Sequence, residues 1–110
     1  MDRAKQKRLE ARGWKVGTAA EFLGLTPEES AYVELKVALG SKLRDLRKRK
    51  RLSQVELARR LGSSQSRVAK IEAADPSVSL DLLVRSLIAL GATRKDLARV
   101  IASATPRAAA

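Results

Sequence analysis

The sequence contains no cysteine and no histidine among its 110 residues. The chain therefore has no thiolate or imidazole ligand for a metal, no cysteine nucleophile and no histidine general base. Disulfide bonds are excluded as well. The neighbouring carboxylates Glu28 and Glu29 fit helix capping better than acid–base catalysis, because they stand at the start of an expected helix. We expect a protein that is not an enzyme and that needs neither a metal nor another cofactor.

Aromatic residues are scarce, at 3% of the chain, whereas 45% of the chain is hydrophobic, mostly leucine, alanine and valine. This aliphatic composition favours the packing of helices against one another over a β-sandwich. A length of 110 residues suits one compact core with an arm or a tail. The composition thus predicts an all-α fold. Because no stretch has the pattern of a signal peptide or a membrane span, a cytoplasmic location is expected.

Positive charge is concentrated in the middle of the chain, whose formal net charge is +11. Residues 41–70 hold eleven lysines and arginines against two acidic residues, while the segments on either side are close to neutral. A clustered positive field attracts polyanions, of which nucleic acid and acidic membrane surfaces are the main candidates. The apolar positions of this segment are needed for a core, which disfavours a membrane partner.

An N-terminal extension is expected at residues 1–30, in which a charged arm leads to a short helix that ends at Gly24. Thr26 is followed by Pro27 and Glu29, the order of residues that starts a helix. Apolar residues then recur every three or four positions, so they line one helical face. These residues are Tyr32, Leu35, Leu39, Leu43 and Leu46.

Two valines, Val33 and Val37, widen this apolar face. The width indicates contact with a second surface, either the N-terminal segment or another subunit. Gly40 interrupts the pattern, and a helical glycine costs roughly 1 kcal/mol relative to alanine. The helix is therefore expected either to kink there or to restart at Ser41.

Two short helices joined by a tight turn follow the basic segment. A capping box starts the first at Ser53, and Gly62 ends it. Ser63 or Ser64 caps the second, which is expected to run to about Ala73. The spacing therefore predicts a pair of helices close together in space.

The last part of the chain shows two more helices before a flexible tail at residues 103–110. Ser79 caps an apolar helix that ends at Gly91, and Thr93 starts the final one. Three apolar residues of the final helix are expected to point inward: Leu97, Val100 and Ile101. The whole pattern predicts a bundle of five or six helices over residues 31–102, with an N-terminal helical extension.

Residues 52–72 read LSQVELARRLGSSQSRVAKIE and resemble the helix-turn-helix of the Xre/Cro family of phage-type repressors. The match rests on the spacing of a small residue, a turn glycine and two core aliphatic residues, here Ala58, Gly62, Val68 and Ile71. It extends over about residues 41–92. One departure is Arg51, where many family members carry a glycine, so either Arg51 adopts a strained positive φ or the loop is built differently.

The resemblance implies that the helix starting near Ser64 lies in the major groove of DNA. If Val68 and Ile71 point inward, four side chains of this helix point outward to base edges. In order of expected importance these are Gln65, Ser66, Ala69 and Lys70. Gln65 can give a bidentate contact to adenine.

The resemblance also assigns contacts to the DNA backbone. Gln54 matches a family position that binds a phosphate and often braces the first recognition residue. Other residues expected at the backbone are Ser53, Ser63, Arg67 and Lys48. Arg47 is implied to pair with Glu72, tying the first helix of the motif to the recognition helix.

What the resemblance implies overall is a repressor of transcription, a homodimer bound to double-stranded operator DNA in the bacterial cytoplasm and associated with the nucleoid. In size and layout the chain is also similar to the HigA-type antitoxins, whose N-terminal segment, here about 3–25, would bind a cognate toxin protein. Two alternatives on the same fold stay open: a protein-interaction adaptor and a non-specific nucleic-acid-binding protein. Gln54 and Gln65 argue against both.

Overall fold

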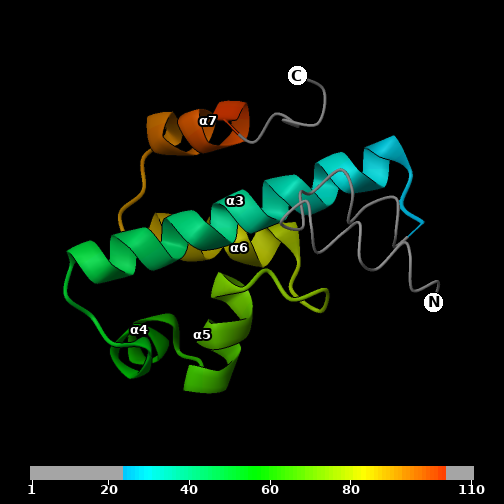
Figure 1. Cartoon of the computed structure of the whole chain (residues 1–110). Helices are drawn as coiled ribbons and strands as arrows, with labels where there is room; N and C mark the ends of the chain where they lie inside the picture. The colour runs from blue at the N-terminus through cyan, green and yellow to red at the C-terminus, as the bar shows by residue number, and fades with distance from the viewer. Residues whose placement is uncertain (1–23, 104–110) are drawn as a thin grey trace, which may run out of the picture. The chain divides into compact units, whose positions relative to one another are not determined.

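A computed structural model of the chain describes residues 24–103 (Figure 1). The chain divides into two units; the described part of the first ends at Glu34, and the second covers Leu35–Ala104. The expected arm and short helix before Gly24 lie outside the described residues, as does the tail from residue 104.

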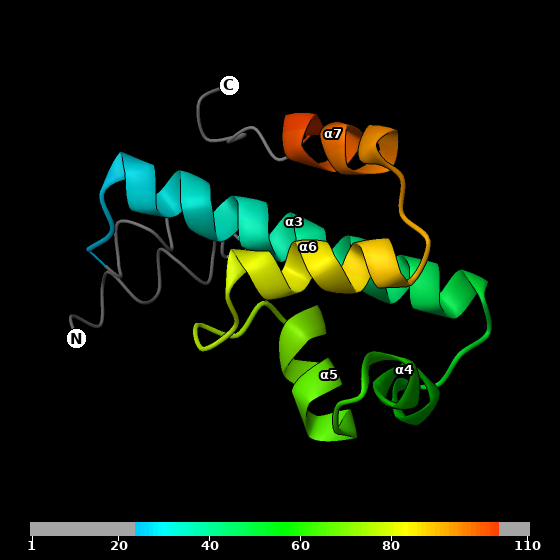
Figure 2. The ribbon, with the colours of Figure 1, turned by 180° about the vertical axis from the view of Figure 1, so that it is seen from behind.

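The described residues form five α-helices and no strand, which confirms the all-α fold. The helices are α3 (Pro27–Arg49), α4 (Gln54–Leu61), α5 (Gln65–Glu72), α6 (Leu80–Ala89) and α7 (Arg94–Ser103). In the second unit, Figures 1 and 2 show α4 and α5 on one side of α3 and α6, and α7 on the other. None of the helices between residues 24 and 103 is long and apolar enough to cross a membrane.

The core of the second unit brings together fully buried aliphatic side chains from four helices. They include Leu39 and Leu43 of α3, Leu57 of α4, Val68 and Ile71 of α5, and Leu83 and Leu87 of α6. Each such side chain contributes about 1.5–3 kcal/mol when it leaves water. This shared burial holds α4 and α5 against α3 and α6. The expected apolar face of α3 is confirmed for its four leucines, since Leu35 and Leu46 also pack against this core, whereas Tyr32 is 46% exposed.

The start of α3 follows the expected capping pattern. The backbone N–H of Thr26 donates to the Glu29 carboxylate at 3.0 Å, and the backbone N–H of Glu29 donates to the Thr26 hydroxyl at 3.1 Å. The hydrogen bond from the Thr26 backbone, helped by the Thr26 side chain, lowers the pKa of Glu29 from its ordinary value.

Gly40 does not end α3, which is continuous from Pro27 to Arg49. Its role is explained by α5. A Cβ placed on Gly40 would lie 2.7 Å from the carbonyl oxygen of Glu72 and 3.0 Å from that of Ile71. Glycine therefore allows the C-terminal end of α5 to pack directly on the backbone of α3, and this close approach outweighs its poor helix propensity.

At the end of α3, Arg51 adopts a left-handed conformation, with φ 57, which decides between the two alternatives that the sequence left open. The N–H of Leu52 donates to the carbonyl of Arg47 at 3.1 Å, and that of Arg51 donates to Lys48 at 3.0 Å. These two bonds close a helix end of the Schellman type, which normally uses glycine. An arginine at this position is strained, because its Cβ crowds the following carbonyl.

Replacing Arg51 with glycine is expected to raise the free energy of unfolding by about 0.5–1 kcal/mol, because the left-handed strain disappears. Urea unfolding followed by circular dichroism measures this gain. Arg51→Ala is the matched control, since it removes the same positive charge but keeps the strain. A glycine variant no more stable than the alanine variant would contradict the explanation.

One expectation for α7 is wrong. The sequence pattern places Ile101 inward, but this residue is 51% exposed. Leu97 and Val100 pack partly buried against the core, and α7 holds no fully buried residue. Because α7 covers only the edge of the bundle, its core-facing side is too narrow to include Ile101.

Candidate nucleic-acid interface

The turn between α4 and α5 is built from local signals. Gly62 ends α4 in the left-handed conformation, with φ 63, and the N–H of Ser63 donates to the carbonyl of Ala58 at 2.8 Å. Ser64 then caps α5 by accepting from the N–H of Arg67 at 3.2 Å. The turn therefore ends one residue before Gln65, which becomes the first residue of α5.

The start of α4 is equally well defined. The Ser53 hydroxyl accepts from the N–H of Glu56 at 3.1 Å, and the N–H of Ser53 donates to the Glu56 carboxylate at 3.0 Å. The backbone hydrogen bond from Ser53 lowers the pKa of Glu56 from its ordinary value. The Ser53 oxygen is thus occupied by the cap, while its own hydrogen remains able to donate to another group.

The side of α5 opposite the core carries the four residues predicted to contact bases. Gln65, Ser66 and Lys70 are exposed, and Ala69 is half-buried. The core side of the helix carries Val68 and Ile71, which are buried. A helix with one buried face and one polar face fits the geometry by which a recognition helix enters the major groove.

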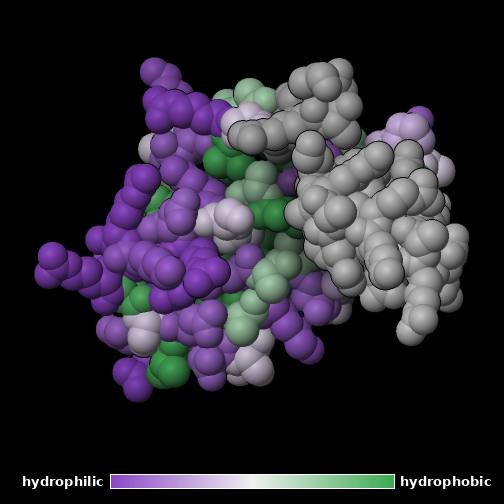
Figure 3. All heavy atoms as spheres, viewed as in Figure 1, coloured by the Kyte–Doolittle hydropathy of each residue, from purple (hydrophilic) through white to green (hydrophobic). Residues whose placement is uncertain are grey.

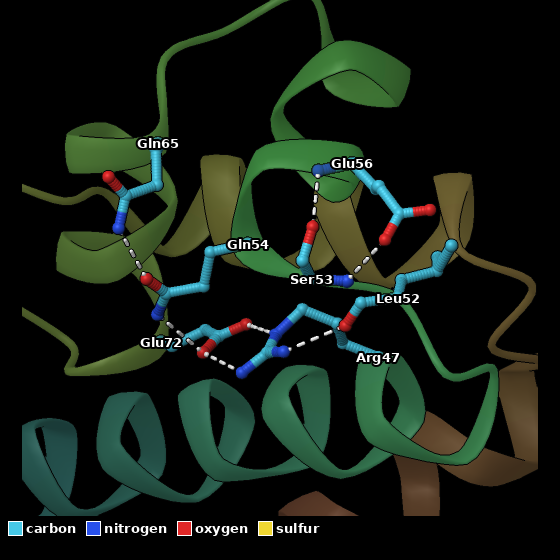
Figure 4. Close-up of polar contacts among 7 residues, drawn as sticks. All are labelled: Arg47, Leu52, Ser53, Gln54, Glu56, Gln65 and Glu72. Carbon is cyan, nitrogen blue, oxygen red and sulfur yellow. Dashed lines mark hydrogen bonds and ion pairs between the residues drawn. The ribbon is translucent and has the colours of Figure 1, made fainter.

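A line of polar side chains runs from α3 through α5 to α4 and back to the start of α5 (Figure 4). Arg47 binds the Glu72 carboxylate through Nε at 2.6 Å and through a terminal nitrogen at 3.2 Å. The amide nitrogen of Gln54 donates to the same carboxylate at 3.2 Å. The amide oxygen of Gln54 accepts from the amide of Gln65 at 3.0 Å. The structure therefore joins two candidate DNA-contacting glutamines to a buried ion pair.

Arg47 and Glu72 are deeply placed, with side chains only 11% and 4% exposed. The remaining Arg47 nitrogen donates to the carbonyl of Leu52 at 2.8 Å, in the loop between α3 and α4. Bidentate pairing of this kind is strong and directional. The pair connects α3 to the C-terminal end of α5. Because the Arg47 side chain is used for contacts within the protein, we assign it a structural role and not a contact with a DNA phosphate.

Ser63 and Arg67, two residues expected at the DNA backbone, line the same open pocket of about 400 Å³ between the α4–α5 turn and α6. Arg60 and Arg85 line it as well. The sequence reasoning missed both arginines. Arg60 lies inside the helix-turn-helix motif, so its position could have been predicted from the sequence. Arg85 lies on α6, and no sequence spacing relates it to the α4–α5 turn. Asp81 lines the pocket too and pairs with Arg85 at 3.6 Å, so the three arginines and this one carboxylate leave a net positive surface beside α5.

Lys48 is exposed in the last turn of α3, within the basic run 47–51. Figure 3 shows mostly hydrophilic atoms where the end of α3 and α4 face the viewer. Positive charge at the C-terminal end of a helix complements the helix dipole. The same charge also adds to the field that attracts a polyanion.

Comparison with known proteins agrees with this geometry. A family model described as a helix-turn-helix domain matches residues 38–100, which is more than half of the chain. The match begins on α3, contains α4, α5 and α6 entirely, and ends on α7. Neither the curated proteins nor the solved structures gave a match. The chain belongs to the helix-turn-helix domain family of DNA-binding regulators, which is typically non-enzymatic.

Proposed function

We propose that this chain regulates transcription by binding a specific duplex DNA sequence, with α5 in the major groove. The observation that carries the proposal is Gln65, exposed in the first turn of α5 and held by Gln54 at 3.0 Å. A side chain fixed before binding loses less conformational entropy in the complex. Such a braced amide at the end of a helix is suited to reading a base edge.

The other outward residues of α5 complete the proposed reading surface. Ser66 serves as donor or acceptor to any base, Ala69 contacts a thymine methyl group, and Lys70 binds guanine or a phosphate. Ala69 is half-buried, so its contact is limited to its methyl group. Gln65 therefore supplies the main share of base discrimination.

Contacts to the DNA backbone position α5. We assign them to Ser53, Gln54, Ser63, Arg67 and Lys48, with Arg60 and Arg85 as additions. Gln54 stands at the first position of α4 and keeps one amide hydrogen beyond its bond to Glu72. Backbone contacts of this kind make affinity depend steeply on salt concentration, independent of sequence.

The proposed form on DNA is a homodimer that represses transcription at a roughly palindromic operator. One recognition helix reads only a few base pairs, and a two-fold axis places the second about 34–36 Å away. Apolar residues are exposed on two helices that could form the dimer contact: Ile101 of α7 is 51% exposed and Val37 of α3 is 49% exposed. Either surface offers apolar area that a partner subunit would bury.

We further propose an Xre/Cro-type domain at 31–102, preceded by an extension at 1–30 and followed by a tail at 103–110. By its similarity to HigA-type antitoxins, the segment 3–25 binds and neutralises a toxin protein. Co-purification with the product of a neighbouring gene tests this part, and failure to co-purify argues against it.

The proposal predicts that Gln65→Ala weakens binding to the specific site by about 1–3 kcal/mol and blurs discrimination at one base pair. Selection from a random duplex pool at about 150 mM salt, with wild type and variant in parallel, measures this. Lys48→Ala is the control, since losing one phosphate contact weakens all sequences alike. If the selected DNA sequences contain an inverted repeat, the protein binds as a two-fold symmetric dimer.

Two results would reject the proposal in favour of another class. Equal losses by Gln65→Ala on specific and random DNA would show that α5 does not read bases, as for a non-specific binder. No salt-sensitive binding to any duplex would identify a protein-interaction adaptor.

A further inference from the structure

The contacts that link Arg47, Glu72, Gln54 and Gln65 have a consequence for base recognition. From them we infer that Glu72 is a specificity-determining positioning residue: its carboxylate fixes which way the Gln65 amide faces, and so which base Gln65 accepts. The inference rests on the proposed function, since it presupposes that Gln65 contacts a base.

Glu72 is held in one place by its burial and by contacts of its backbone and its side chain. Its backbone carbonyl lies against Gly40, where even a Cβ would come within 2.7 Å. Its side chain is 4% exposed, and Arg47 binds both carboxylate oxygens at 2.6 and 3.2 Å. A carboxylate that is buried and held by a guanidinium fork has little freedom to turn.

The chemistry of this carboxylate decides the orientation of Gln54. An ionised carboxylate only accepts hydrogen bonds, so Gln54 must turn its NH₂ group towards Glu72 Oε1, at 3.2 Å. The amide oxygen of Gln54 then faces Gln65. Turning the amide of Gln54 over would bring two acceptor oxygens together in a mostly buried place, which is costly.

The orientation of Gln65 follows from that of Gln54. Because the oxygen of Gln54 accepts, Gln65 must offer its NH₂ group, and the two atoms lie 3.0 Å apart. Gln65 keeps one amide hydrogen and its own oxygen for a ligand. A donor beside an acceptor, in this order, matches N7 and the N6 amino group of adenine. A reversed amide would exchange the two positions and lose the match.

The test measures base preference at the base pair where Gln65→Ala loses discrimination. Four duplexes differing only at that pair compete for wild type, Glu72→Gln and Arg47→Lys. Glu72→Gln keeps the size of the side chain, but its amide can either accept a hydrogen bond from Gln54 or donate one to it. The amide groups of Gln54 and Gln65 are then free to adopt either orientation. Arg47→Lys is the matched control, because it weakens the buried pair and leaves the carboxylate facing Gln54. Circular dichroism sets a temperature at which all three proteins are folded.

A bidentate contact of this kind separates right from wrong bases by about 5- to 150-fold. Wild type and Arg47→Lys are expected to keep an adenine preference in this range. In Glu72→Gln, the affinities for the four duplexes are expected to differ by no more than about threefold. The test rests on the ratio of affinities among the four duplexes, because turning Gln54 also disturbs its proposed phosphate contact and changes the affinity for every duplex alike. An undiminished adenine preference in Glu72→Gln overturns the inference and leaves the proposed function standing. A wild type without base preference overturns both.

A second variant covers the case in which Glu72→Gln does not fold. Gln54→Met has a similar length and no polar amide, so it leaves Glu72 and Arg47 paired but breaks the connection to Gln65. The adenine preference is expected to fall to within about threefold here as well. A Gln54→Met protein that keeps the full preference shows that Glu72 does not act through Gln54, and the inference fails.

Discussion

Arg47→Ala is expected to lower the free energy of unfolding by about 3–5 kcal/mol, because it leaves the Glu72 carboxylate buried without its cation. Only 4% of the Glu72 side chain is exposed, so water cannot replace the lost partner. The variant also loses the bond from Arg47 to the carbonyl of Leu52. A loss of this size is a large part of the stability of a small domain.

Thermal and urea unfolding, followed by circular dichroism, measure this effect. Arg49→Ala is the matched control, since Arg49 is exposed in the same helical turn, and a change within about 0.5 kcal/mol is expected there. The double variant Arg47→Met with Glu72→Met should regain most of the loss, because an apolar pair removes the stranded charge. If Arg47→Ala and Arg49→Ala proved equally stable, the buried pair would have no structural role.

Gly40→Ala is expected to destabilise the protein by about 1–3 kcal/mol, although alanine is the better helix former. Helix propensity alone predicts the opposite, a gain of roughly 1 kcal/mol. The added Cβ would meet the Glu72 carbonyl oxygen at 2.7 Å, which is backbone and cannot move aside cheaply. The two effects have opposite signs, so the sign of the measured change decides between them.

The same unfolding measurements test this prediction, with Ser41→Ala as the control. Ser41 is the next residue of α3 and is exposed, so its replacement changes propensity without a contact. We expect a small gain in stability for Ser41→Ala and a loss for Gly40→Ala. A more stable Gly40→Ala protein would contradict the close packing of α3 and α5.

The helix boundaries were predictable because their signals are local. Ser53 with Glu56 and Thr93 with Asp96 form capping pairs three residues apart, and Gly62 supplies the left-handed end of α4. Each signal acts within one helical turn, so the neighbouring residues suffice to identify it. The motif spacing in 52–72 extended this prediction to α5.

Other features depended on how the helices pack. The inward position expected for Ile101 was wrong. The spacing of apolar residues along α7 does not show how much of the helix surface contacts the core. Whether α3 kinked at Gly40 stayed open, because the answer lies on α5, far along the chain. The pocket that joins Arg85 to the α4–α5 turn has no counterpart in the sequence pattern.

By itself, then, the sequence determined that this protein is helical, where its described helices begin, and which surface of α5 points outward. These properties follow from capping, periodicity and turn residues, whose energies act over one or two turns. Only the tertiary structure decided that Glu72 meets both Arg47 and Gln54. These contacts join residues on three helices, and their existence depends on angles and distances of packing that no local pattern encodes.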